Sequence, residues 1–281
     1  MSVREEKKMV KKCYIQKLFY MPKTIEVEKV YRDNYGAPGE KRKGKSKRTP
    51  EDIKRQNEWI AEKNLRRTIN LNFGEDDWHV ILTYEKDNRP KNAVEARKHI
   101  KYFMDKVRKL FRRAGQTFKF VGAFGIGSRG APHFHIIINN FVDNNTSASK
   151  ILRDCWKYGR VKLMALDDIG DYKDLANYII KQSKDTFREE ESVFKQRYTC
   201  SRNLIKPEPE IKELNRYWSK HTREITIDNE LIEQGWYIDK NTIVDGINPV
   251  TLRHYQCYTL RLDERLHNKW MKMQKMRDKN V

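Results

Sequence analysis

The stretch HFHIII, His133 to Ile138, decides how the middle of this chain is expected to fold. Side chains alternate between the two faces of a β-strand, so His133 and His135 project from one face with Cα atoms about 6.6 Å apart. From that spacing both imidazoles can reach one metal ion. The three isoleucines predict an interior strand, where a pair of histidines is uncommon. Two interpretations stand here, a metal site or a hydrogen-bonded histidine pair at a strand end.

The segments around this strand predict an α+β domain. The run WHVILTY, Trp78 to Tyr84, is β-branched and of strand length, and apolar residues recur at helical spacing over 92–113. Further predicted elements are a strand at 118–124, a helix capped by Thr146 or Ser147, a strand at 160–165 and a helix at 172–183. The order strand, helix, strand, strand, helix, strand is that of the ferredoxin-like βαββαβ fold with a central antiparallel sheet.

The domain organisation follows from this central block. We expect a basic N-terminal extension over residues 1–75 that is partly helical, the sheet domain over 76–205, and a C-terminal extension over 206–281 packed on or adjoining it. Thr49 and Pro50 have the residue types of a helix N-cap and first helical position. Strand formers occupy 24–31, and a further helix is predicted near 211–219.

Charge and cysteine usage restrict the class of protein. Lys and Arg total 59 against 39 acidic residues, a formal net charge of +20. Such an excess favours a nucleic-acid partner, because neutralised phosphates release condensed counterions. The four cysteines are far apart without a C-x-x-C pair, which indicates reduced thiols. No apolar run or leader-like segment suggests a membrane or secretion, so we expect a cytoplasmic protein.

A tyrosine on the last predicted helix is the candidate nucleophile. Tyr178 and Lys181 stand three residues apart and therefore share a helix face. A phenol is protonated at neutral pH and is a poor nucleophile unless a cation or metal stabilises the developing charge. The alternative interpretation is that Tyr178 fills the core together with Ile179 and Ile180.

Taken together, these motifs resemble those of the HUH endonucleases, the replication initiators of rolling-circle plasmids and phages. HVILTY, PHFHIII and YIIK match the first, second and third motifs of that family in order. TPEDIKRQNEWIAEKNLRR and RYTCSRNLIKP resemble the bacterial and phage-type initiators, so the resemblance covers roughly residues 49–260.

The resemblance implies an enzyme that nicks and joins single-stranded DNA at an origin hairpin. It implies that Tyr178 attacks the scissile phosphodiester and becomes linked to the 5′ side of the cut. His133 and His135 would hold Mn²⁺ or Mg²⁺ as a Lewis acid, and Lys181 would act beside the tyrosine. It also makes residues 76–205 the endonuclease domain.

The chain departs from the family at the third metal ligand, which is often a glutamate on the strand before the histidines. The matching position is Gly125, and no acidic residue lies between Gly115 and His135. Glu85, just past the first strand, is a weak candidate. His79 is open between a ligand, a structural residue and a DNA-binding residue.

Other functions remain open at this point. A conjugative relaxase or a single-strand transposase would use the same chemistry, and a DNA-binding module that lost nicking would retain the fold. The string GEKRKGKS at 39–46 fits the P-loop pattern but lacks the strand and helix that the motif needs. We therefore expect a separate host helicase to unwind the duplex. The sequence does not give the oligomeric state.

Overall fold

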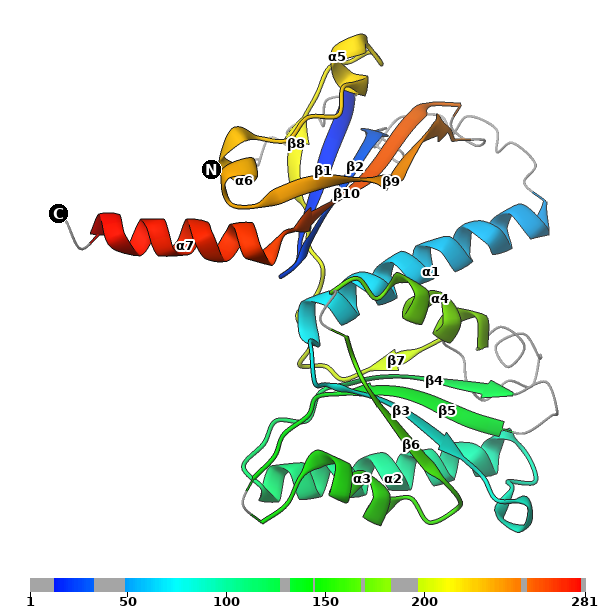
Figure 1. The fold of residues 1–281 in the computed structure, drawn as a ribbon. Coiled ribbons are helices and arrows are strands. Elements are labelled where there is room, and N and C mark those ends of the chain that lie inside the picture. The colour runs from blue at the N-terminus through cyan, green and yellow to red at the C-terminus, as the bar shows by residue number, and fades with distance from the viewer. Residues whose placement is uncertain are drawn as a thin grey trace, which may run out of the picture. The chain divides into compact units, whose positions relative to one another are not determined.

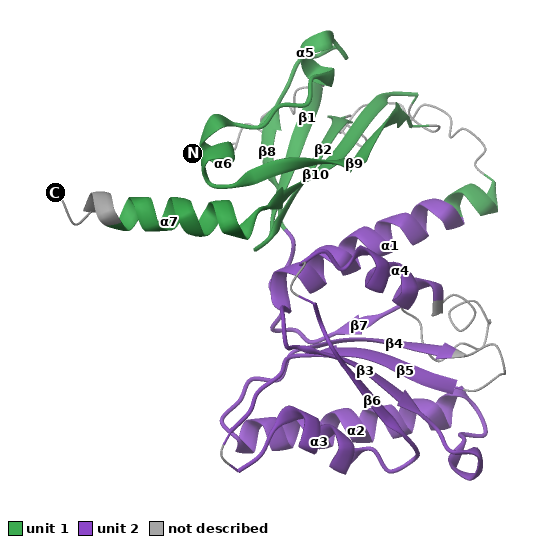
Figure 2. Cartoon of the chain, viewed as in Figure 1, with its two compact units in different colours: residues 1–53, 208–281 green, residues 54–207 purple. Residues whose placement is uncertain are grey.

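The computed structural model describes most of the chain (Figure 1). The described residues are 13–32, 49–126, 132–143, 145–167, 170–182, 197–248 and 252–278. The chain divides into two compact units, one formed by residues 1–53 with 208–281 and the other by residues 54–207 (Figure 2).

The second unit is built on one antiparallel sheet with strand order β6-β3-β5-β4-β7. Its strands are β3 (Trp78–Thr83), β4 (Phe120–Ile126), β5 (Pro132–Ile138), β6 (Val161–Ala165) and β7 (Thr199–Cys200). Its helices are α1 (Pro50–Asn72), which begins in the first unit, η1 (Lys86–Asn88), α2 (Ala93–Arg113), α3 (Ala148–Cys155) and α4 (Lys173–Gln182). Strand β5, which carries the HFHIII stretch, lies at the centre of this sheet.

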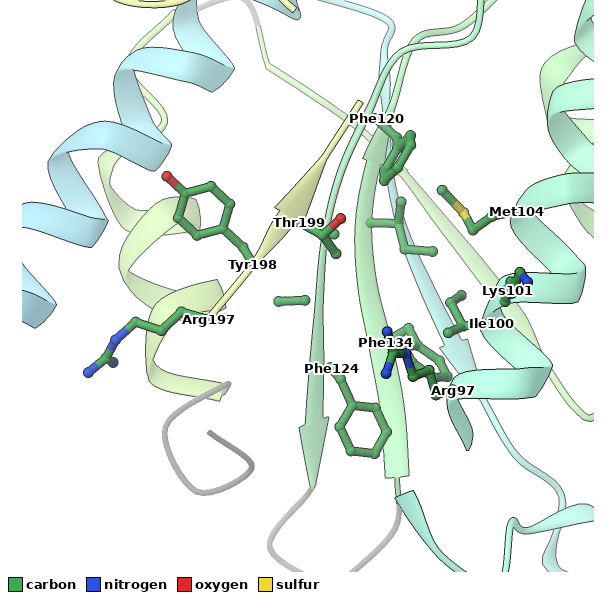
Figure 3. A pocket seen from close by; sticks show the side chains of 13 residues that line it. Arg97, Ile100, Lys101, Met104, Phe120, Phe124, Phe134, Arg197, Tyr198 and Thr199 are labelled. Atoms are coloured by element: carbon green, nitrogen blue, oxygen red, sulfur yellow. The ribbon is translucent and has the colours of Figure 1, made fainter. Parts of the chain in front are cut away.

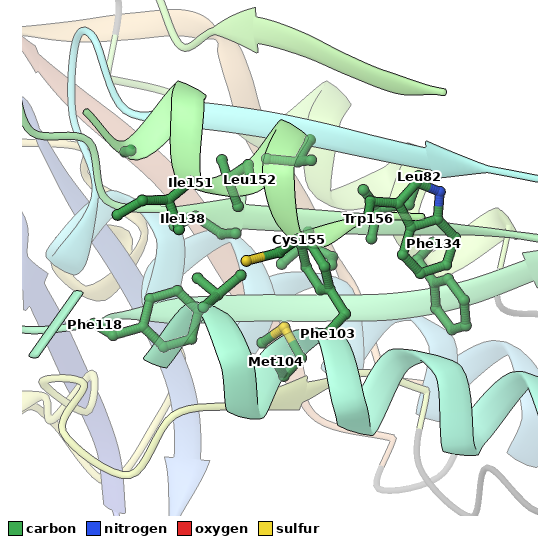
Figure 4. Close-up of a cluster of buried hydrophobic side chains, with 14 of the residues drawn as sticks. Leu82, Phe103, Met104, Phe118, Phe134, Ile138, Ile151, Leu152, Cys155 and Trp156 are labelled. Carbon is green, nitrogen blue, oxygen red and sulfur yellow. The ribbon is translucent and has the colours of Figure 1, made fainter. Parts of the chain in front are cut away.

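Helices α2 and α3 cover one face of the sheet (Figures 1 and 4). Both begin at side-chain caps, because the Asn92 side chain accepts from the backbone N–H of Glu95 and that of Ser147 from Lys150. The hydrophobic core on this face includes Phe103 of α2, Leu152 of α3 and Phe134 of β5. We call it the α2/α3 face.

Helices α1 and α4 lie on the opposite face (Figure 1). Leu65 and Ile69 of α1 and Ala176 and Ile179 of α4 pack there against the sheet residue Ile137. The Thr49 hydroxyl accepts from the backbone N–H of Asp52 where α1 begins, as its sequence predicted. We call this side the α1/α4 face.

The first unit contains a separate antiparallel sheet of order β8-β1-β2-β10-β9. Its strands are β1 (Cys13–Tyr20), β2 (Thr24–Arg32), β8 (Glu210–Glu213), β9 (Trp236–Ile247) and β10 (His254–Leu262). The short helices α5 (Lys220–Arg223) and α6 (Asn229–Glu233) and the longer α7 (Glu264–Asp278) complete it. Its core includes Ile25, Val27 and Tyr258. The N-terminal and C-terminal segments thus share one sheet.

Several sequence expectations are confirmed. The α+β class holds, and the strand-helix-strand-strand-helix-strand order runs from β3 to β6. The strand expected at 24–31 is β2, and no disulfide joins the four cysteines. None of the helices in the described ranges is long and apolar enough to cross a membrane.

Other expectations differ from the structure. The helix predicted near 211–219 is wrong, because residues 210–213 instead form β8, an exposed edge strand paired with β1. The sequence was divided into extensions at 1–75 and 206–281, whereas the structure joins residues 1–53 and 208–281 in one unit. The P-loop-like string lies outside the described residues.

Candidate metal and tyrosine site

Strand β5 places both motif histidines on the α1/α4 face of the sheet. His133 lies between Thr83 of β3 and Gly125 of β4 in the strand register. His135 lies between Ile81 and Ala123 in the same way. Their neighbour Phe134 points to the opposite core, as the alternation of a strand requires. The predicted sharing of one face by the two histidines is therefore realised.

The two imidazoles lie close together. Their ring centroids are 4.8 Å apart and the rings are nearly perpendicular, at 88°. The His135 side chain is buried at 1% exposure, whereas His133 is half-buried. Among the described residues nothing reaches the buried Nε2 of His135 with a hydrogen bond. A buried polar atom left in this way costs free energy and indicates a missing partner.

A third histidine joins this pair from β3. His79 is 5% exposed, and its Nε2 lies 3.1 Å from Nδ1 of His135, within hydrogen-bonding distance. Burial lowers the pKa of His79 to about 4, assisted by the charge of Lys162. Burial likewise lowers the pKa of His135 to about 3, assisted by His79 and His133. Both buried imidazoles are therefore neutral at neutral pH, the form that binds metals.

Tyr178 of α4 meets this cluster. Its ring centroid is 5.0 Å from that of His135, in an edge-to-face arrangement at 84°. Tyr178 remains 42% exposed, while the following Ile179 and Ile180 are buried. The interpretation of Tyr178 as core filling is wrong, because the isoleucines fill the core and the phenol is at the surface. Lys181 is also exposed and lies three residues further on the same helix.

Another tyrosine near this helix, Tyr172, is not accessible as a nucleophile. Tyr172 is 4% exposed and its hydroxyl donates to the backbone carbonyl of Asp167. It belongs to the core of the α1/α4 face. Of these two tyrosines, Tyr178 is the one whose phenol is accessible.

The donor set suits a divalent cation only in part. The paired imidazoles and the unpartnered Nε2 of His135 fit a metal, since imidazole binds manganese and similar ions well. In the described part of the chain, however, no three His, Cys, Asp or Glu side chains form a metal-binding group. Gly125 lies opposite His133 without a side chain, and Glu85 is exposed. A metal here would have two protein ligands and positions left for water or phosphate.

A separate cavity lies on the other side of the sheet. It measures about 660 Å³ and opens between α2, β4 and the segment that leads into β7 (Figure 3). Phe124 and Phe134 of the α2/α3 core line it, and Arg97, Lys101 and Arg197 are its charged residues. None of the four predicted site residues lines this cavity. The histidine and tyrosine cluster is therefore distinct from this cavity.

The comparison with protein families agrees with the location of the cluster. Residues 77–183 match a family model of the replication-associated proteins. No curated protein and no solved structure matches the chain significantly. The matched segment contains His79, His133, His135, Tyr178 and Lys181, and supports a replication-associated protein of the initiator type.

Proposed function

We propose that this protein is a rolling-circle replication initiator that nicks and joins single-stranded DNA through a tyrosine. The observation that carries the proposal is the contact between the half-exposed Tyr178 ring and the buried His135 ring. The two residues come from different elements, α4 and β5, yet meet on one face of one sheet. Both lie within the segment that matches the replication-associated family.

The fold supports the same proposal. Numbered within the domain, the strands β3, β4, β5 and β6 are the first to fourth, and their order β6-β3-β5-β4 is fourth-first-third-second. This order, with two helices on one face, supports our proposal of a ferredoxin-like sheet, the fold implied by the resemblance to HUH endonucleases. The central strand then carries the histidines, and the helix that follows the last strand carries the tyrosine.

The proposed reaction is a transesterification. The Tyr178 phenol oxygen attacks the phosphorus of the scissile phosphodiester and loses its proton to water. The new bond from oxygen to phosphorus forms as the bond from phosphorus to the 3′ oxygen breaks, and that oxygen takes up a proton. The products are a 5′-phosphotyrosine and a free 3′-OH. Attack by a 3′-OH on the phosphotyrosine reverses these steps and joins the strand.

In this proposal His133 and His135 hold a divalent cation, Mn²⁺ or Mg²⁺, which supplies Lewis-acid charge at the phosphate when bound. Lys181 is exposed on the tyrosine's helix face and contributes positive charge beside the developing phenolate and phosphate. The net charge of +20 suits single-stranded DNA as the partner. Duplex unwinding is assigned to a host helicase.

The test is detection of the covalent intermediate. Labelled single strands that tile the encoding replicon are incubated with the protein and Mn²⁺, and adducts are sought after denaturation. We expect one strand to give an adduct with the unmodified protein and none with Tyr178→Phe. Tyr102→Phe is the matched control, because Tyr102 is 60% exposed but lies on α2, across the sheet. An adduct of equal yield from Tyr178→Phe would overturn the assignment.

One observation favours a second candidate, a DNA-binding module of the same fold without nicking. Gly125 lies opposite His133 in the register, where a third ligand would be placed, and it offers no side chain. This alternative predicts sequence-selective binding of an origin strand but no adduct on any strand. Measuring binding and adduct formation on the same oligonucleotides separates the two candidates.

A further inference from the structure

We propose that His79 is the positioning residue of the metal site. Its Nε2 accepts a hydrogen bond from Nδ1–H of His135, and this fixes the tautomer of His135 whose Nε2 lone pair is available to a cation. The inference deepens the proposed function and rests on it for the identity of the ligand. The hydrogen bond itself can be tested without DNA, metal or activity.

The geometry singles out one nitrogen of each ring. Nε2 of His79 and Nδ1 of His135 are 3.1 Å apart, while Nε2 of His135 is buried with no hydrogen-bond partner among the described residues. The two nitrogens of His135 therefore have different surroundings, one paired within the protein and one not. Metal-binding histidines show this division, with one nitrogen on the ion and the other held by a neighbouring acceptor.

The direction of the hydrogen bond decides what His135 can do. If His79 donated, His135 would carry its proton on Nε2, and a buried N–H would have only the neighbouring aromatic rings as acceptors, a weak interaction. If His135 donates from Nδ1, its Nε2 carries a lone pair directed at a place where a cation can satisfy it. The second arrangement puts no proton on the buried, unpartnered Nε2 of His135 and places the His79 proton on Nδ1, and we assign it.

The surroundings of His79 hold its ring in place. His79 is 5% exposed, with Ile137 of β5 and Met164 of β6 as its strand neighbours. Its Nε2 lies 3.1 Å from Nδ1 of His135, so the ring is positioned as the hydrogen-bond acceptor that the assignment requires.

The same contact argues against His79 as a third metal ligand. Its Nε2 is engaged with His135, and the described side chains contain no three-residue metal-binding group that includes it. Among the interpretations left open by the sequence, ligand, structural residue or DNA contact, the geometry points to a structural residue that orients a ligand. Its near-complete burial removes the DNA contact.

The first test reads the tautomer directly. Long-range proton–nitrogen NMR correlations of ¹⁵N-histidine-labelled, metal-free protein distinguish a protonated Nδ1 from a protonated Nε2. We expect His135 to carry its proton on Nδ1 at pH 7. A His135 ring protonated on Nε2 would overturn the proposal, whatever the enzymatic activity of the protein.

The second test measures Mn²⁺ binding by electron paramagnetic resonance of the free ion. We expect His79→Leu to weaken Mn²⁺ binding about 10- to 100-fold, the loss typical of removing a partner of a metal-binding histidine. His79→Gln should restore it to near wild type, because its Oε1 lies as many bonds from Cβ as Nε2 and accepts hydrogen bonds. Val80→Ala, in the core of the opposite face, controls for destabilisation and should bind as wild type.

These outcomes distinguish a failure of the positioning role of His79 from a failure of the proposed function. Equal Mn²⁺ binding by His79→Leu and wild type overturns the positioning role. Absence of Mn²⁺ binding by wild type overturns the cation as the partner of His135 Nε2, and with it the metal-dependent function. A missing Tyr178 adduct, with Mn²⁺ binding that depends on His79, overturns only the nicking reaction.

Discussion

The two faces of the sheet in residues 54–207 differ in chemistry although the same strands build both. On the α2/α3 face β3 and β5 contribute Leu82, Phe134 and Ile136 to the hydrophobic core (Figure 4). On the α1/α4 face the alternate positions of the same strands include His79, His133 and His135, together with Ile81, Thr83 and Ile137. Two helices cover each face (Figure 1), and the second face keeps a half-exposed tyrosine at the cluster.

This difference shows where the unit is optimised for stability and where it is not. Apolar burial is the main stabilising contribution on the α2/α3 face. The α1/α4 face has an apolar core as well, but it also carries two buried imidazoles and an unpartnered nitrogen. Burial of such polar groups costs stability. A polar cluster kept at such a cost, next to an accessible phenol, is what a functional site requires.

The largest effect is expected on the apolar face. Phe103→Ala removes a ring that is 1% exposed and edge-to-face with Trp156, and should lower the free energy of unfolding by about 3–5 kcal/mol. Urea unfolding measures this. Tyr102→Ala, the adjacent residue at 60% exposure, should change it by less than about 0.5 kcal/mol. Equal losses for the two variants would remove the basis for calling this face the stabilising core.

The next effect belongs to the histidine face and depends on pH. Folding holds the pKa of His79 at about 4 and that of His135 at about 3, below their usual value. The unfolded chain therefore binds more protons below about pH 6.5. Above about pH 6.5 the two histidines therefore do not reduce the free energy of unfolding. As the pH decreases from there toward 4, the free energy of unfolding should fall by up to about 1.4 kcal/mol per pH unit for each histidine.

Urea unfolding of metal-free protein at several pH values measures this slope. In the double variant His79→Leu/His135→Leu, the free energy of unfolding should depend less steeply on pH over the same range. The pH dependence that remains in this variant comes from other groups such as His99, whose pKa is also lowered by burial. Identical slopes for the two proteins would show that the buried histidines are not neutral in the folded state.

The sequence predicted this second unit well because its signals are local. Alternation over 133–138 placed His133 and His135 on one face, and helical spacing placed Tyr178 and Lys181 on another element. The burial of Ile179 and Ile180 turned the tyrosine outward. The first two conclusions need only the period of a strand or a helix, whereas the exposure of Tyr178 was open in the sequence and comes from the structure.

What the sequence could not give depends on pairing between distant segments. The first unit pairs β2 with β10, more than 200 residues later, and its edge strand β8 replaced a predicted helix. The role of His79 required the register between β3 and β5, which sets its ring beside His135. Composition does not specify a register, since a slip of one residue exchanges the two faces.

A smaller effect should follow from supplying the missing ligand. Gly125 is the cross-strand partner of His133, so a side chain there lies on the same face, with Cβ atoms about 5 Å apart. We expect Gly125→Glu to bind Mn²⁺ roughly tenfold more tightly than wild type, because a carboxylate adds charge and a third ligand. Calorimetry measures this, with Gly125→Gln as the uncharged control. No gain over Gly125→Gln would mean that the cation does not bind at His133.

The smallest effect on stability is expected from replacing the buried histidines of the α1/α4 face, although both side chains are buried. His79→Leu/His135→Leu replaces both members of a buried hydrogen bond with apolar side chains and removes the unpartnered Nε2. Such paired replacement is nearly neutral or stabilising. At pH 7 the free energy of unfolding should therefore equal that of wild type within about 1 kcal/mol, or exceed it, while Mn²⁺ binding is lost. A decrease of several kcal/mol in the free energy of unfolding would instead show that the histidine pair stabilises the fold. Both faces of the sheet would then serve stability, despite their different composition.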